Sequence, residues 1–121
     1  MSDTFETAYA PTLKAVFIEQ AQQQIAQGAE ALSSARSYAE LGKPEFALAF
    51  LLLVGESSSE EEKRETLAHA YERRATLADA KASEYSLQFH RPFPLIKLEA
   101  RKDLQTAQAI RQGRPIEENN T

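Results

Sequence analysis

Apolar side chains recur every three or four residues along most of the chain, the spacing that gives an α-helix one buried face. The longest such segment, residues 57–89, contains neither proline nor glycine. Its apolar positions are Leu67, Tyr71, Ala75, Ala78, Ala82, Tyr85 and Phe89. At about 1.5 Å per residue the segment predicts a rod of about 45 Å. A rod of this length needs other helices beside it to bury its narrow apolar stripe.

The start of this long helix is marked by serines and glutamates. Each serine of the run 57–59 stands three residues ahead of a glutamate of the run 60–62. This is the capping-box spacing, in which a hydroxyl and a carboxylate satisfy backbone N–H groups of the first turn. The glutamates also suit the positive end of the helix dipole.

Further helices are predicted over residues 12–41, 44–54 and 95–112. Gly28 interrupts the first of them, and the pattern leaves open whether residues 12–41 form one helix or two. Gly42 and Pro44 predict a tight turn between antiparallel neighbours. The helix over 44–54 is apolar on nearly all sides, so we expect it to be the most buried element. Two prolines within residues 90–94 separate the long helix from the last one.

These elements predict an all-α protein, a three- to four-helix antiparallel bundle. We expect residues 1–11 to be a flexible lead-in, residues 12–113 to form a single helical-bundle domain, and residues 114–121 to be a frayed tail. A chain of 121 residues is large enough to bury a core without disulfides or metals.

We expect the protein to be cytoplasmic. The chain has no cysteine, and its N-terminus lacks the basic-then-apolar pattern of a signal peptide. The longest apolar run, residues 46–54, is about half the length of a membrane span. The net charge of −4 disfavours generic binding to nucleic acid.

Positive charge is concentrated near the C-terminus. Residues 90–115 carry six basic side chains against two acidic ones, whereas residues 1–89 carry eight against fourteen. The six are Arg91, Lys97, Arg101, Lys102, Arg111 and Arg114. They would dock the last helix onto an acidic bundle, or form a basic patch that faces an acidic partner or a membrane surface.

No catalytic motif stands out. The chain contains no glycine-rich phosphate loop, no Gly-x-Ser-x-Gly elbow and no His-Glu-x-x-His motif. Of its two histidines, His69 has Glu65 four residues before it and Glu72 three residues after it, and a Glu–His pair of this kind is a weak indication of a metal site. We expect no enzymatic activity, no cofactor and no metal.

Two helical families resemble parts of the chain. The spacing Ala35-x2-Tyr38-x3-Gly42-x4-Ala47-x3-Leu51 resembles a tetratricopeptide (TPR) hairpin, although a second repeat would lack its turn glycine. Residues 29–81 resemble a microtubule-interacting and trafficking (MIT) domain, in which such a hairpin is followed by a long third helix. The matching residues are the turn over 42–48 and Tyr71-x2-Arg74-Ala75-x-Leu77. The resemblance implies a three-helix bundle that binds short helices or extended tails in grooves between its helices.

The leading hypothesis is a non-enzymatic protein–protein interaction module that takes a partner helix or tail peptide into an inter-helix groove. We place this groove between the first helix and the long one, near Tyr38, Tyr71, Arg74 and Ala78. One alternative is a self-assembling structural bundle whose last helix packs on a copy of itself. A further alternative is a basic C-terminal helix that binds an anionic surface or nucleic acid.

Overall fold

The computed structural model describes residues 4–116, and every regular element in that range is helical. The α-helices are α1 (Phe5–Tyr9), α2 (Ala15–Ala26), α3 (Ala31–Glu40), α4 (Pro44–Leu53), α5 (Glu60–Phe89) and α6 (Pro94–Arg111). Two short 3-10 turns, η1 (Ala10–Thr12) and η2 (Gly55–Ser57), follow α1 and α4. The prediction of an all-α bundle is confirmed, although the helices outnumber the three or four expected.

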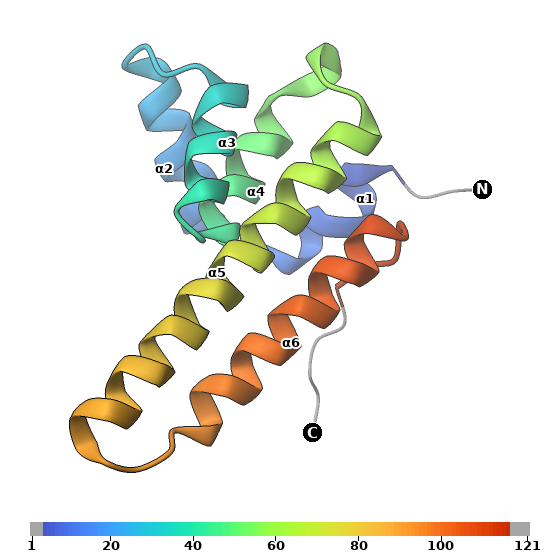
Figure 1. Cartoon of the computed structure of the whole chain (residues 1–121). Helices are drawn as coiled ribbons and strands as arrows, with labels where there is room; N and C mark the ends of the chain where they lie inside the picture. The colour runs from blue at the N-terminus through green and yellow to red at the C-terminus, as the bar shows by residue number, and fades with distance from the viewer. Residues whose placement is uncertain (1–3, 117–121) are drawn as a thin grey trace.

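The long helix α5 organises the molecule. Helices α3 and α4 pack beside its N-terminal half, α2 packs on α4, and α6 returns along α5 so that the two form a long hairpin (Figure 1). A 30-residue helix spans about 45 Å, whereas the 10 to 12 residues of α2, α3 and α4 span about 15 to 18 Å. The short helices therefore cover only part of α5, and the α5–α6 turn projects beyond them (Figure 1).

The segment over residues 12–41, whose continuity the sequence left open, forms two helices. Gly28 has a φ of +105°, a backbone conformation that residues with side chains rarely adopt, and it separates α2 from α3. Both helices pack on α4, and a side-chain contact joins them, since the amide nitrogen of Gln24 lies 3.2 Å from the hydroxyl of Tyr38. The first of the two begins at Ala15, three residues later than expected.

Helix α4 is the most buried element, as its sequence predicted. Its buried residues are Pro44, Ala47, Leu48, Ala49, Phe50 and Leu51. The turn before it lies directly on α5, because a Cβ atom at Gly42 would sit 3.0 Å from the backbone nitrogen of Arg74. Gly42 also has a φ of +70°. Close approach and left-handed backbone both favour glycine at this turn.

The predicted cap of α5 is confirmed for one serine of the three. Ser59 is the N-cap, and its hydroxyl accepts a hydrogen bond of 3.1 Å from the backbone N–H of Glu62. Ser57 instead donates to the carbonyl of Val54. At its other end α5 stops at His90, whose φ of +55° is left-handed.

The expected flexible lead-in over residues 1–11 is wrong for the part that the structure describes. Thr4 caps α1 by accepting from the N–H of Thr7, and both Phe5 and Tyr9 are 1% exposed in the core. The N–H of Phe5 also donates to the carboxylate of Glu60 at 3.0 Å. Burial of two aromatic rings four residues apart stabilises a helix too short to persist alone. Residues 1–3 lie outside the described range.

The expected frayed tail over residues 114–121 is wrong at its start. The hydroxyl of Tyr9 donates to the carbonyl of Arg114 at 2.8 Å, and Ile116 packs against the core. The packed domain therefore extends over residues 4–116, beyond the predicted 12–113, because the two ends of the chain stabilise each other. Residues 117–121 lie outside the described range.

Candidate functional site

The four residues predicted to line a groove do not come together in one place. Tyr38 stacks on Phe46 and Phe50 of α4, with ring centroids 5.1 and 5.6 Å apart. Its hydroxyl meets Gln24 of α2. Tyr38 therefore joins α2, α3 and α4, and it is not among the residues that line the hollow described below.

Tyr71 and Arg74 do lie together, but in a contact between helices. The Arg74 guanidinium carbon is 5.1 Å from the Tyr71 ring centroid. The same guanidinium donates to both carboxylate oxygens of Asp103 in α6, at 2.9 and 2.8 Å, and to Glu45 in α4 at 3.2 Å. Arg74 thus links three helices. Ala78, one turn further along α5, is half-buried.

Burial and charge shape the ionisation of this cluster. Desolvation raises the pKa of the Tyr71 hydroxyl to about 12. The hydrogen bond to Asp103 raises the pKa of Arg74 further above its ordinary value. Arg74 therefore stays charged and Tyr71 stays neutral across the physiological range, as expected of a structural ion pair beside an aromatic ring.

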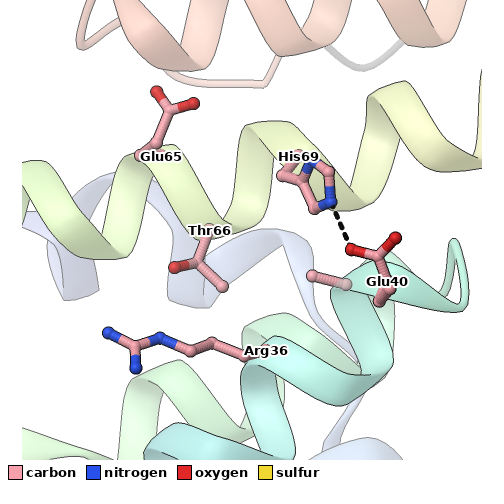
Figure 2. Close-up of a pocket in the computed structure, with 6 residues that line it drawn as sticks. Arg36, Glu40, Glu65, Thr66 and His69 are labelled. Carbon is pink, nitrogen blue, oxygen red and sulfur yellow. Dashed lines mark hydrogen bonds and ion pairs between the residues drawn. The ribbon is translucent and has the colours of Figure 1, made fainter.

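A hollow does lie between α3 and α5, the two helices where the groove was predicted. Its volume is about 360 Å³, and it is lined by Arg36, Ala39, Glu40, Glu65, Thr66 and His69. Figure 2 shows Arg36 and Glu40 rising from α3 on one side and Thr66 and His69 from α5 on the other. The region predicted from the sequence is therefore hollowed, but by residues other than the four named.

Carboxylates dominate the electrostatics of this hollow. His69 Nε2 lies 2.8 Å from Glu40 Oε2, and Arg73 donates to the backbone carbonyl of Glu40 at 3.0 Å. Hydrogen bonding to His69 lowers the pKa of Glu40, and hydrogen bonding to Arg111 lowers the pKa of Glu65. Both carboxylates are therefore charged at neutral pH and already hold cations of this chain.

Arg36 differs from these paired groups. Its side chain is 61% exposed, and its contact with Glu62 is long, at 3.8 Å. It is therefore a mostly exposed cation among the residues that line the hollow.

The six predicted basic residues divide between two roles. Arg111 binds Glu65 at 2.7 Å and Glu72 at 2.6 Å on α5, which agrees with the interpretation that the last helix docks on an acidic surface. Lys102 lies 3.7 Å from Glu99 of its own helix. The other four, Arg91, Lys97, Arg101 and Arg114, are exposed.

A cluster of aromatic rings closes the far end of the α5–α6 hairpin. Tyr85, Phe89 and Phe93 form three mutual ring contacts, with centroids 5.6 to 6.0 Å apart. Two cations lie over this cluster: Lys81 is 5.6 Å from the ring centroid of Tyr85, and Arg91 is 5.1 Å from that of Phe93. Such contacts favour keeping the cations at the tip.

Large apolar side chains are exposed along the same hairpin. The most exposed are Leu87 at 79% and Leu95 at 74%, followed by Phe89 at 53%. The others on α5 and α6 are Leu77, Leu98 and Leu104. We call residues 81–102 the distal hairpin.

Sequence reasoning expected a basic patch in this region but did not identify the exposed leucines beside it, and Leu87 lies outside the predicted apolar stripe of the long helix. The element lengths held a partial signal. A single helix over residues 12–41 would match a rod of about 45 Å, whereas two shorter helices would not reach its end. The structure forms two shorter helices there, so of the helices after α1 only α6 accompanies α5 to its end.

Within residues 4–116, no cluster of three or more acidic, histidine or cysteine side chains could hold a metal ion. Nor does this part of the chain contain a helix both long enough and apolar enough to cross a membrane.

The fold places the protein in the class of all-α helical bundles. Comparisons with protein-family models, curated proteins and solved structures gave no match. The resemblance to MIT domains and TPR hairpins therefore stays a prediction.

Proposed function

We propose that this protein is a non-enzymatic protein–protein interaction module that binds a helix or extended segment of a partner between α3 and α5. The observation that carries the proposal is the hollow between these helices, with its volume of about 360 Å³. It lies at the inter-helix position that the sequence pattern indicated for a groove.

The lining defines the chemistry of the partner segment. Ala39 is a buried, small residue that allows close approach of a partner backbone. Arg36 supplies an exposed guanidinium that suits a carboxylate or carbonyl of the partner. Since Glu40 is paired with Arg73 and Glu65 with Arg111, we expect the partner to contribute acidic or neutral groups to Arg36.

The ionisation of the hollow favours binding over catalysis. A general acid working near neutral pH needs a carboxyl pKa raised towards 7. Here the pKa of Glu40 is lowered by its hydrogen bond to His69, and the pKa of Glu65 by its hydrogen bond to Arg111. The hollow therefore offers fixed charges to a partner.

The test is site-specific photo-crosslinking in cells that express the full chain. A crosslinking residue replaces Ser33, an exposed position of α3 one turn before Arg36, and a second version carries it at Gln22, an exposed position of α2. We expect a discrete partner adduct from position 33 and none from position 22. Equal adducts from both positions, or none from either, would contradict the proposal.

Two threonine-to-arginine changes, one inside the hollow and one outside it, provide a matched comparison. Thr66→Arg places a long side chain in the hollow, whereas Thr76→Arg changes an exposed threonine of the same helix that makes the same hydroxyl-to-carbonyl bond one turn back. We expect Thr66→Arg alone to abolish the adduct. An adduct formed by two copies of this chain would instead support the self-assembling alternative.

A further inference from the structure

The distal hairpin combines exposed apolar side chains with positive charge at a convex end of the molecule. Leu87 and Leu95 are the two most exposed large apolar residues in the described chain, and they flank the turn that joins α5 to α6. This turn points away from the other helices (Figure 1). Exposed apolar clusters of this kind mark interaction sites.

The charge of this region opposes that of the remaining chain. Residues 81–102 carry five lysine and arginine side chains against two carboxylates, a net charge of +3. The other residues carry nine against sixteen, a net charge of −7. The chain is therefore strongly polarised, and its hairpin end attracts an anionic surface while the other end is repelled by it.

The placement of the apolar residues disfavours a partner helix. Leu87 and Phe89 are two residues apart on α5, which puts them about 200° apart around the helix axis. A helix bound in a groove needs its anchors on one face, at spacings of three, four and seven residues. Leu87 and Phe89 therefore do not lie on one helix face, but both are close to the end of the hairpin.

A second copy of the chain is disfavoured by charge. In a two-fold symmetric contact the same patch meets itself, so a net charge of +3 would face +3. Like charges placed opposite one another oppose association. An anionic partner would be attracted to this positive patch, whereas a second copy would be repelled.

We propose that the distal hairpin docks end-on onto an anionic lipid surface. Leu87, Phe89 and Leu95 enter the boundary between headgroups and acyl chains, where apolar burial stabilises the contact. Arg91, Lys97 and Arg101 remain at headgroup level and attract the negative surface potential of the membrane. The aromatic cluster behind them suits the interfacial region. This proposal does not depend on the hollow between α3 and α5.

The absence of tryptophan from the chain permits a direct test. Leu87→Trp places a single fluorophore at the tip, and Leu41→Trp places one at an exposed leucine outside the distal hairpin. The probes are vesicles of phosphatidylcholine and phosphatidylserine at about three to one, and vesicles of phosphatidylcholine alone. We expect a blue shift for Trp at 87 with the anionic vesicles only, and none for Trp at 41.

Sedimentation with the same vesicles tests each contribution separately. We expect L87Q/L95Q and R91E/K97E each to lower the partition coefficient about tenfold or more, and added salt to weaken binding of the unmodified chain. Leu41 and Lys14 are exposed residues outside the distal hairpin. We expect the control changes Leu41→Gln and Lys14→Glu to leave binding unchanged. Circular dichroism confirms that each variant is helical.

Several outcomes would overturn the proposal. They are no binding of the unmodified chain to anionic vesicles, equal binding to neutral vesicles, and binding that persists in both tip variants. A concentration-dependent mass that the tip variants abolish would overturn it in favour of self-association through the hairpin.

Discussion

At the scale of single residues, the side chains with most influence on this bundle are those that link helices distant in sequence. Arg74 contacts α4 and α6 from its place on α5, and Arg111 reaches from α6 to two glutamates of α5. A bidentate arginine–carboxylate pair fixes orientation as well as distance. Arg74, which the sequence assigned to partner binding, makes these contacts within the protein.

Asp103→Ala should destabilise the protein by about 2 kcal/mol, because it removes a buried carboxylate that accepts two charged hydrogen bonds from Arg74. Urea unfolding measures the change. Glu99→Ala removes the exposed partner of Lys102 and should alter stability by less than about 0.5 kcal/mol. Equal effects of the two changes would show that the Arg74 pair contributes no more than a surface contact.

Tyr71 makes the protein sensitive to alkaline pH. Burial raises the pKa of its hydroxyl from 10.0 to about 12, so the neutral form is favoured in the folded state. The stability that this provides is complete below pH 10 and is lost as pH rises towards 12. Between about pH 9 and pH 11 the unmodified chain should lose about 1 kcal/mol more unfolding free energy than Tyr71→Phe. Tyr85→Phe is the control, and parallel losses in the unmodified chain and Tyr71→Phe would refute the prediction.

At the scale of elements, length and turn geometry decide which surfaces are covered. Helix α4 is buried because it is apolar on all sides and short enough to be surrounded. Helix α5 is covered by other helices over its N-terminal half, and α6 accompanies it to its end. The turn at Gly42 brings α3 and α4 against α5, and beyond this turn only α6 lies beside α5.

Gly42→Ala should destabilise the fold by about 3 kcal/mol. The new Cβ would require a left-handed backbone and would meet the Arg74 backbone at 3.0 Å. Gly55→Ala is the matched control, since Gly55 has a φ of +69° and no atom within 4 Å of an added Cβ. We expect it to cost about 1 kcal/mol in thermal or urea unfolding. Similar losses at the two glycines would show that backbone strain alone accounts for the effect.

At the scale of the whole molecule, the structure separates a packed body from a projecting hairpin. The body contains α1 to α4 with the first half of α5, and the hairpin carries the exposed leucines. The net charges of these parts have opposite signs. This polarity supports the proposal that the tip docks on an anionic lipid surface.

The chain should be monomeric by light scattering over at least a tenfold range of concentration, with a mass near 13.5 kDa. Repulsion between the positive distal hairpins opposes their symmetric contact. A mass of twice this value that rises with concentration would support the self-assembling alternative. Residues of α6 would then be the first to change.

The parts of the fold that the sequence alone determined are those set by local pattern. Helical spacing, the Ser59 cap, the proline break before α6 and the apolar run of α4 depend on neighbours in the chain, so they could be predicted. The short helix α1 could not, because its stability comes from burial of Phe5 and Tyr9 against distant elements. Contacts with distant elements also decide whether a helix continues through a glycine, so the sequence left open whether residues 12–41 form one helix or two.

Only the tertiary structure decided which side chains face solvent and which link helices. Periodicity places Tyr38, Arg74 and Leu87 on helices, but it does not say what lies beside them. The structure stacks Tyr38 on α4, binds Arg74 to Asp103 and leaves Leu87 exposed. The physical reason is that exposure depends on which helices run alongside and how far they reach, and this is settled by packing between segments distant in the sequence.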